Sequence, residues 1–279
     1  MCIRDSIDTD YKLNTRPVGN IEFNIKKFNF PGDSKEGIYN VHFEVREGTT
    51  VGIVGRTGSG KSTLIRLLLR EYDTKETHEI TYGEHPIRDY NVQLLRNQFG
   101  YVPQEHFLFS TSIRNNIAFS NEKIGDNQIF AASQASDIHE DILSFPDQYQ
   151  TVVGERGVSL SGGQKQRISI ARALLIDPEV LILDDSLSAV DAKTEEVILS
   201  NLKKLRKGKT NIITAHRMSA VKQADEIIVM DKGTIVEKGT HSTLMNQKGW
   251  YYETYRAQAL QQKLTRNLDD LTKGDDTNG

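Results

Sequence analysis

The chain has 279 residues, 37 % of them apolar and 26 % charged, which is ordinary for a globular protein with one large domain or two smaller ones. Its 35 basic and 38 acidic side chains give a net charge of -3, so the charge balance favours neither nucleic acid nor an anionic membrane as a partner. The only cysteine, Cys2, excludes an internal disulfide framework and a cysteine metal cluster. No apolar run approaches the roughly 20 residues of a transmembrane helix, so we expect the chain alone to be soluble.

Both ends of the chain are expected to lie outside the folded domain, which we place at residues 21–260. The opening MCIRDS follows no pattern and resembles the translated adapter scars at the ends of assembled gene fragments, which indicates a natural start further upstream. Residues 7–20 are polar and include Pro17 and Gly19, as linkers do. The acidic residues 261–279, which end in glycine, are predicted to be disordered.

The first half of the domain begins with strand patterns. Apolar and polar residues alternate in 21–30 and 41–45, which predicts two strands with the turn PGDSKEG between them. The segment TVGIVG, residues 50–55, predicts a third strand that leads directly into a helix with leucine and isoleucine at helical spacing. Residues from about 87 to 175 carry short amphipathic patterns and few strand signals, which predicts a mostly helical insert.

Strand patterns return in the second half. They occupy VLILD at residues 180–184, NIITAH at 211–216 and a hairpin at 226–239 that turns at residues 231–233. In a closing helix, Tyr251, Tyr255 and Ala259 share one face. Because strands alternate with helices, we expect an α/β fold with a parallel sheet covered on both faces.

The sharpest local motif is GRTGSGKST at residues 55–63, which fits G-x-x-x-x-G-K-[ST] between a predicted strand and a predicted helix. Its glycines let the backbone wrap around phosphate oxygens and point N–H groups inward, while the lysine adds a positive charge. A glycine turn of purely structural purpose is the alternative. The candidate phosphate-binding residues are Gly55, Thr57, Gly58, Gly60, Lys61, Ser62 and Thr63.

Two adjacent carboxylates, Asp184 and Asp185, end the apolar run VLILD. A phosphate cradle needs a carboxylate to complete a metal site, so Asp184 is the candidate Mg²⁺ ligand together with the Ser62 hydroxyl. Asp185 then becomes a candidate for handling the attacking water. A helix N-cap or a solvated loop acid is the alternative role for Asp184.

The segment LSGGQKQRISIARALL, residues 160–175, is the second strong motif. Ser161 and Gln164 have the spacing of a capping box, so a helix is predicted to begin just after Ser161. Gly162 and Gly163 leave the first N–H groups uncovered, which suits an anion, although a simple capped helix is the commoner case.

Taken in order, GRTGSGKST, Gln104 in YVPQ, LSGGQ, VLILDD, SAVD at residues 188–191 and His216 resemble the nucleotide-binding domain of an ABC transporter. The resemblance covers residues 21–258. It implies a P-loop NTPase core of the RecA type with a parallel sheet, an antiparallel β subdomain and a helical subdomain, binding ATP and Mg²⁺. The loop TVVGERG at residues 151–157 is similar to the exporter loop that faces the membrane domain. Phe30 matches the aromatic residue that stacks on adenine.

The resemblance also implies how the motifs are shared. Two such domains pair head to tail, and residues 161–164 of one, Ser161, Gly162, Gly163 and Gln164, meet the γ-phosphate held by the other. Gln104 contacts Mg²⁺ or the attacking water, and His216 contacts the γ-phosphate from its own side. Taken alone, a histidine after an apolar strand is more often a core or surface residue.

Asp185 departs from the family pattern, because active members carry glutamate immediately after the metal aspartate. Aspartate is one methylene shorter, roughly 1.5 Å of reach, and a misplacement of about an ångström can cost about a hundredfold in rate. We therefore expect slow hydrolysis at this chain's own site and an intact signature that completes a partner's site. That combination resembles the degenerate half of bacterial heterodimeric multidrug exporters.

This resemblance implies a partner chain with glutamate after its metal aspartate, a transmembrane domain fused upstream, and a place at the cytoplasmic face of the cell membrane. Three alternatives stay open: a homodimeric exporter domain with slow turnover, a regulatory subunit that binds nucleotide without hydrolysing it, and a soluble ABC ATPase without a transport role.

Overall fold

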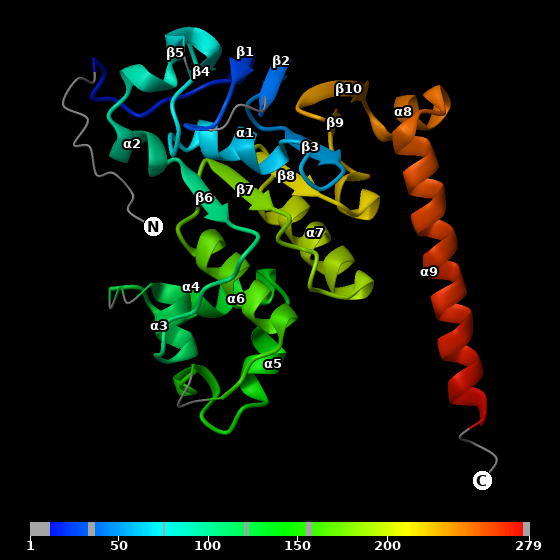
Figure 1. Ribbon diagram of the computed structural model, residues 1–279. Coiled ribbons are helices and arrows are strands. Elements are labelled where there is room, and N and C mark those ends of the chain that lie inside the picture. Colours follow the sequence, from blue (N-terminus) through cyan, green and yellow to red (C-terminus); the bar gives the residue numbers. More distant parts are fainter. Residues whose placement is uncertain are drawn as a thin grey trace.

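The computed structural model describes residues 12–32, 37–74, 76–119, 121, 123–154 and 158–275, with side chains for all of these except 262 and 265–275. Three layers follow one another in Figure 1: an antiparallel sheet, a mainly parallel sheet and a group of helices. The segment MCIRDS and residues 33–36 and 155–157 lie outside the described residues, so the start of the linker and parts of the predicted turn and exporter loop do too.

The antiparallel sheet has the strand order β2-β1-β4-β5. The predicted first two strands are β1 (Ile21–Phe28) and β2 (Ile38–Val45), which pair with Phe23 opposite Phe43. These two rings stack at 4.5 Å, as cross-strand aromatic pairs do on a buried face. The short strands β4 (Ile80–Tyr82) and β5 (His85–Pro86) complete the sheet and were not predicted from the sequence.

The second sheet has the order β10-β9-β3-β8-β7-β6, and only β10 runs antiparallel to its neighbour. Its predicted strands are β3 (Thr50–Gly55), β7 (Val180–Asp184), β8 (Thr210–Ala215), β9 (Glu226–Asp231) and β10 (Thr234–Gly239). The turn between β9 and β10 contains Lys232 and Gly233, both with positive φ, which suits a tight hairpin.

Helices cover both faces of this sheet, as the α/β prediction required. The helix α1 (Lys61–Leu68) is buried between the two sheets, in a core that includes Phe23, Ile53 and Leu64. On the other face lie α7 (Ala192–Leu205) and the short helix η4 (Met218–Val221), whose core includes Val54 and Leu183. The fold is thus an α/β P-loop NTPase core with an added antiparallel sheet.

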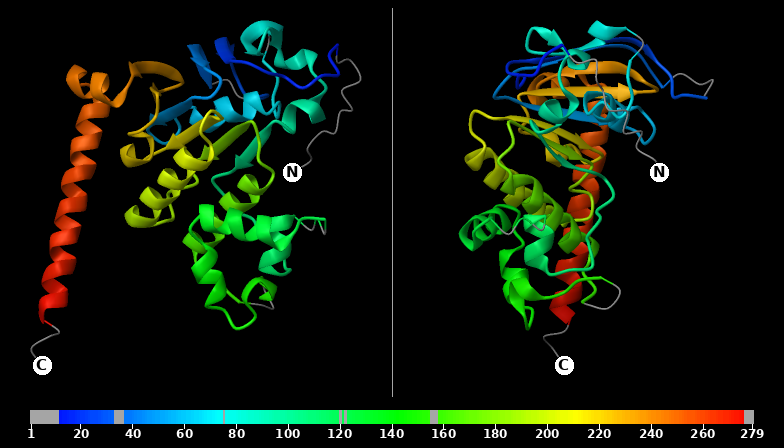
Figure 2. Two further views of the ribbon diagram at one scale, coloured as in Figure 1. Left: turned by 180° about the vertical axis from the view of Figure 1, so that it is seen from behind. Right: turned by 90° about the vertical axis from the view of Figure 1, so that its left-hand side faces the viewer.

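A separate helical subdomain lies beyond the edge strand of the parallel sheet (Figures 1 and 2). It has its own core, in which Ile129, Ile142 and Ile168 are fully buried. Its elements are α3 (Ile113–Ala118), α4 (Asp126–Ala135), α5 (His139–Leu143), η3 (Gln148–Gln150) and α6 (Gly162–Leu175).

The predicted insert of about 87–175 is therefore too wide at its start. Residues 87–102 hold η2 (Ile87–Asp89), α2 (Val92–Arg96) and the strand β6 (Phe99–Val102), which is the edge of the parallel sheet. Because β6 has only four residues and one of them is Gly100, it gives no alternating pattern. The short η1 (Thr77–Glu79) was also not predicted.

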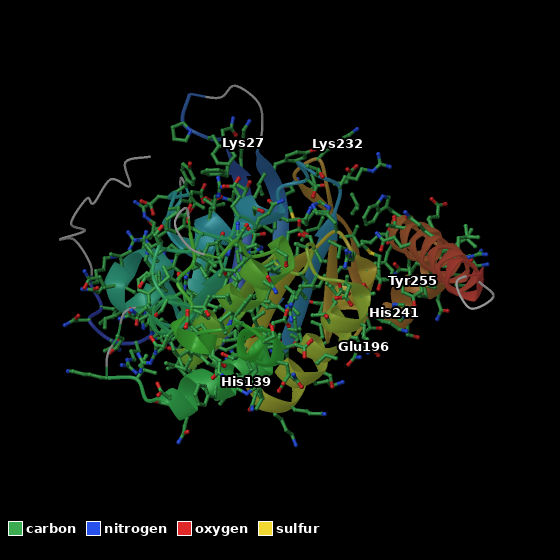
Figure 3. All side chains as sticks on the ribbon, turned by 90° about the horizontal axis from the view of Figure 1, so that it is seen from below. Lys27, His139, Glu196, Lys232, His241 and Tyr255 are labelled. Atoms are coloured by element: carbon green, nitrogen blue, oxygen red, sulfur yellow. The ribbon has the colours of Figure 1, made fainter. Side chains whose placement is uncertain are left out.

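The chain closes with α8 (His241–Gln247) and α9 (Trp250–Asp275). The carboxylate of Glu237 accepts the backbone N–H groups of Trp250 at 2.5 Å and Tyr251 at 3.2 Å, so a strand residue caps the start of α9. His241 and Tyr255 lie together on this side of the molecule, with ring centroids 4.9 Å apart (Figure 3).

Farther along, α9 leaves the domain (Figures 1 and 2). Residues 261–275 are helical in the structure, where the sequence predicted disorder. Leu260 and Leu264 are exposed, so burial of these two side chains does not account for the helix. None of the helices in the described part of the chain is both long and apolar enough to cross a membrane.

Candidate functional site

The predicted phosphate loop connects β3 to α1, as its motif requires. A side chain at Gly55 would place its Cβ 2.1 Å from the carbonyl oxygen of Met230 on the neighbouring strand, so only glycine fits there. Gly58 and Gly60 have φ of 78° and 104°, and Gly60 is the N-cap of α1. Thr57 and Gly58 are exposed at the top of the loop, and Thr63 is half-buried in the first turn of α1.

Lys61 lies inside this loop with only 6 % of its surface exposed. Its Nζ donates to the carbonyl oxygens of Gly55 at 2.9 Å and Arg56 at 3.1 Å. Burial lowers the pKa of Lys61, and the nearby carboxylates of Asp185 and Asp184 oppose that shift. The ammonium group is therefore held by loop carbonyls that phosphate oxygens can replace.

Asp184 ends β7 beside the loop and is buried. Its Oδ1 accepts hydrogen bonds from Ser62 Oγ at 2.9 Å and from Thr214 Oγ1 at 2.6 Å, and its Oδ2 accepts one from Tyr101 OH at 3.4 Å. A carboxylate and a hydroxyl at the mouth of a phosphate loop are hard oxygen donors of the kind that Mg²⁺ takes together with phosphates and water. The residues present thus fit a magnesium ion.

Asp185 follows in the left-handed conformation, with φ of 47°. Its backbone N–H donates to both the carbonyl and the hydroxyl oxygen of Thr214, each at 3.0 Å. Its Oδ2 accepts from Gln104 Nε2 at 3.4 Å and lies 3.9 Å from His216 Nε2. Burial raises the pKa of Asp185, while His216 and Lys61 oppose the shift. The three predicted catalytic side chains therefore meet at one point.

The signature residues 161–164 lie elsewhere, at the start of α6. The predicted capping box is present: Ser161 Oγ accepts from Gln164 N at 3.2 Å, and Gln164 Oε1 accepts from Ser161 N at 3.0 Å. Among the described residues, no hydrogen bond or ion pair joins this helix start to the phosphate loop. Gly163 packs against residues 188–191, because a Cβ there would lie 3.0 Å from Ala189 O.

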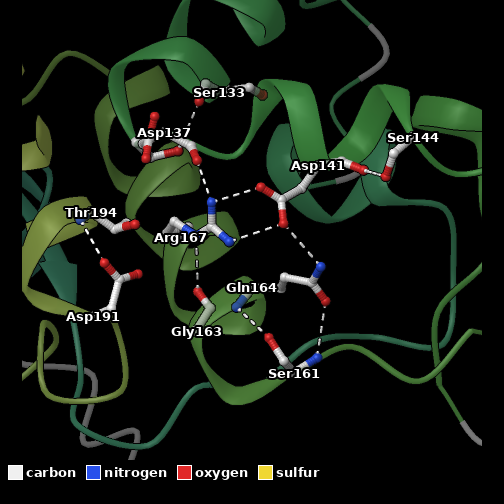
Figure 4. A network of polar contacts seen from close by, with 11 residues as sticks. Ser133, Asp137, Asp141, Ser144, Ser161, Gly163, Gln164, Arg167, Asp191 and Thr194 are labelled. Carbon is white, nitrogen blue, oxygen red and sulfur yellow. Dashed lines mark hydrogen bonds and ion pairs between the residues drawn. The ribbon is translucent and has the colours of Figure 1, made fainter. Parts of the chain in front are cut away.

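A polar network that the sequence did not reveal supports this helix start (Figure 4). Asp141 of α5 accepts from Gln164 Nε2 at 3.0 Å and from two guanidinium nitrogens of Arg167 at 2.8 and 3.1 Å. Arg167 also donates to the carbonyl oxygens of Asp137 and Gly163. Because one carboxylate orients the Gln164 amide, the other end of that amide is fixed on Ser161.

Phe30, the predicted adenine platform, lies just after β1 and is half-buried. Its ring meets those of Phe28 and Tyr72 edge to face, each at 5.2 Å. The residues that sequence reasoning missed are Thr214, Tyr101, Asp141 and Arg167. Each acts through a contact between elements far apart in the chain, and the sequence gives no local sign of those contacts.

Comparison with known proteins shows the family to which the chain is related. The family model described as "ABC transporter" matches residues 38–188. The "Probable multidrug resistance ABC transporter ATP-binding/permease protein YheI" of Bacillus subtilis is 47 % identical over 92 % of this chain and 44 % of its own length. The "Multidrug resistance-like ATP-binding protein MdlA" of Escherichia coli is 46 % identical over 88 % of this chain and 42 % of its own length.

A solved bacterial Atm1-family ABC exporter with ATP bound is similar in structure, with a TM-score of 0.82 and 38 % identity over 89 % of this chain and 43 % of that one. The chain thus spans less than half the length of these relatives. Domains with these motifs bind ATP and hydrolyse it. On its sequence motifs, its fold and these matches, the chain belongs to the ABC transporter family, as an ATP-binding domain of the exporter type.

Proposed function

We propose that this chain powers export across a membrane by binding Mg·ATP at its phosphate loop and closing on a second ATP-binding domain. The observation that carries the proposal is the 2.9 Å hydrogen bond from Ser62 Oγ to Asp184 Oδ1, which brings the phosphate loop and the acidic end of β7 together. These two residues would hold Mg²⁺, which neutralises phosphate charge when it is bound. Gln104 lies within reach of the same acidic edge.

Within this chain, Lys61 exchanges its two loop carbonyls for phosphate oxygens, and the N–H groups of the loop and of α1 point at the same anion. Phe30 supplies a ring face for adenine. His216 lies beside Asp185, where its ring can contact the terminal phosphate. Gln104 can orient a water near Asp185.

An exposed aromatic cluster on the helical subdomain supports docking of a membrane domain. Phe107, Phe109 and Phe119 are 66 %, 45 % and 63 % exposed, and their rings meet edge to face in series at 5.0 and 5.7 Å. Exposed aromatic clusters of this kind mark protein interfaces. The cluster follows Gln104 in sequence, so a membrane domain seated here, at the cytoplasmic face of the membrane, would lie close to the site. We propose that such a domain precedes this one in the natural protein.

The signature end of α6 supports the second contact. Ser161 and Gly162 are exposed, and Asp141 supports their helix start from the side through Gln164. A second ATP-binding domain, paired head to tail, would bring its own γ-phosphate to this end. Ser161, Gly162, Gly163 and Gln164 then complete the partner's site rather than their own.

The site of this chain is proposed to be the slow one of the pair. The Asp185 carboxylate lies 3.4 Å from Gln104 Nε2 and 3.9 Å from His216 Nε2. Its side chain has one methylene less than the glutamate of active family members. We therefore propose a heterodimer, in which the partner chain carries glutamate after its metal aspartate. A homodimeric exporter with slow turnover uses the same geometry in both halves and is the second candidate.

Steady-state ATPase activity of the complete transporter tests this assignment. Asp185→Asn should have a mild effect, because it removes a charge already badly placed for catalysis. Ser161→Arg should lower turnover by about a hundred- to a thousandfold, the usual effect of losing an oxyanion donor, since it blocks the faster site of the partner. If Asp185→Asn silences the transporter and Ser161→Arg leaves it active, the asymmetric pair is wrong and this chain has a self-sufficient site.

A further inference from the structure

The backbone at His216 is held by the closing helix, which lies about 40 positions later in the sequence. Gln258 of α9 uses both ends of its amide for this. Its Nε2 donates to the backbone carbonyl of His216 at 2.8 Å, and its Oε1 accepts the backbone N–H of Met218 at 2.9 Å. The two bonds lie on either side of Arg217, so a single side chain spans the whole turn that follows β8.

This turn needs such support because it has no ladder of its own. The strand β8 ends at Ala215 and η4 begins at Met218, so residues 216 and 217 lie outside regular structure. Backbone groups in such a position take their partners from side chains or from water. Gln258 is the partner of the backbone carbonyl of His216 at the start of the turn and of the backbone N–H of Met218 at its end.

Arg217 holds the same turn on the side away from α9, through contacts with residues 188–195. Its guanidinium donates to the carbonyl oxygens of Val190 at 2.8 Å and Ser188 at 3.1 Å, and to Glu195 Oε2 at 3.2 Å. The turn is therefore held between residues 188–195 on one side and α9 on the other. The His216 imidazole lies 3.9 Å from Asp185, too far for a hydrogen bond, so its place depends on a backbone that these two anchors hold together with the Asp185 carboxylate.

We infer that Gln258 is a positioning residue for His216, and that α9 thereby sets how well this chain distinguishes ATP from ADP. The inference rests on the proposed function, in which His216 contacts the γ-phosphate. ATP and ADP differ only by that group. A shift of the His216 backbone should therefore weaken ATP binding and leave ADP binding unchanged.

The surroundings of Gln258 allow the test without loss of the fold. Gln258 lines a cavity of about 640 Å³, whose walls also include residues of α7, η4 and α9 such as Leu199, Met218 and Tyr255. When the amide is replaced, water in this cavity can take over the exposed backbone groups, so they are not left buried without partners. The packing of α9 through the fully buried Tyr251 stays in place.

The experiment is calorimetric titration of the 279-residue chain with Mg·ATP and Mg·ADP. Gln258→Leu should weaken ATP binding by about tenfold, the effect of losing the hydrogen bond from His216 to the charged γ-phosphate. ADP binding should stay as it was. Gln258→Glu should act in the same way, because its carboxylate still accepts from Met218 but no longer donates to His216. Glu253→Leu, an exposed change on the same helix, is the matched control and should alter neither affinity.

His216→Ala and the double variant complete the design. His216→Ala should lower the affinity for ATP but not for ADP. Adding Gln258→Leu to it should lower the ATP affinity no further, since both changes act through the His216 imidazole. The inference is overturned if Gln258→Leu leaves the ATP-to-ADP ratio unchanged, if it weakens both nucleotides equally, or if His216→Ala has no effect. Lys61→Ala distinguishes a failure of this inference from a failure of the proposed function. If Lys61→Ala binds nucleotide as tightly as the parent chain does, the proposed function itself is overturned.

Discussion

The phosphate loop and the signature end of α6 are both made of glycine and hydroxyl residues, yet their polar groups differ in exposure and in what supports them. In the loop, Lys61 is bonded to the loop's own carbonyls and Ser62 to Asp184, so the groups that would bind phosphate and metal are bonded to one another. At the signature end, Ser161 and Gln164 are also bonded to each other, but Ser161 is exposed and Asp141 of another helix holds the Gln164 amide.

The difference matches what each region would meet. A site that takes nucleotide from solution has to exchange internal partners for new ones, which keeps its polar groups satisfied before binding. A surface that closes on a nucleotide already held by another molecule gains from being fixed in advance, because less ordering is needed on contact. Each region can be disturbed separately, and the expected effects differ in kind as well as in size.

The largest effect is expected in the phosphate loop. Lys61→Ala removes the only buried cation among the described residues that contacts the loop carbonyls, and it should weaken Mg·ATP binding by at least about a hundredfold. Calorimetric titration measures the change. Lys204→Ala, an exposed change on α7, serves as the control and should bind as the parent does. Equal affinity of the parent and Lys61→Ala would remove the loop from the nucleotide site.

A pair of adjacent glycines tests how tightly the signature end is packed. A Cβ at Gly163 would lie 3.0 Å from the Ala189 carbonyl oxygen, whereas one at Gly162 would lie 3.7 Å from Ala189 Cβ, an ordinary contact. Alanine favours the helix at both positions, so Gly163→Ala should be less stable than Gly162→Ala by about 1 kcal/mol. Urea unfolding of the two variants compares them directly. Equal stability would mean that residues 188–191 yield freely and do not fix the signature end.

The smallest effect concerns the outer support of Gln164. Burial alone would raise the pKa of Asp141, but hydrogen bonds from Arg167 and Gln164 outweigh it and lower the pKa below its ordinary value of 3.8. A carboxylate with a lowered folded-state pKa stabilises the fold above the unfolded pKa, and this contribution is lost as pH falls through the folded value.

Asp141→Asn should therefore reduce the free energy of unfolding by about 1 kcal/mol or less near neutral pH, since the pair is partly exposed. The difference from the parent should shrink below about pH 4, where the parent carboxylate also takes up a proton. Urea midpoints measured over this pH range give the comparison. A difference that stays constant with pH would show that shape rather than charge holds Gln164 in place.

The motifs carried most of what the sequence could predict. Strands with a clear alternation or a continuous apolar run were found, and GRTGSGKST and VLILDD located the loop and its acid because local chemistry and local structure agree there. The edge strand β6 was missed because its four residues have no period, and its place is set by pairing with β7. The role of Asp141 could not be found from sequence, because Gln164 and Arg167 reach it across 23 and 26 positions.

One hydroxyl on β8 has a wider consequence. Thr214 lies opposite Asp184 in the sheet, donates to its carboxylate and accepts the N–H of Asp185, and its strand leads within two residues to His216. Asp184 and Asp185 are thus fastened to one pair of strands and would shift together if that pair shifted. The spacing of the two carboxylates is a property of the sheet, so loops around the site can change while Asp184 and Asp185 keep their alignment. Thr214→Val keeps the shape and the backbone bond from the Asp185 N–H to the residue 214 carbonyl, but it loses both hydroxyl hydrogen bonds and should loosen the Asp184 carboxylate within this strand pair.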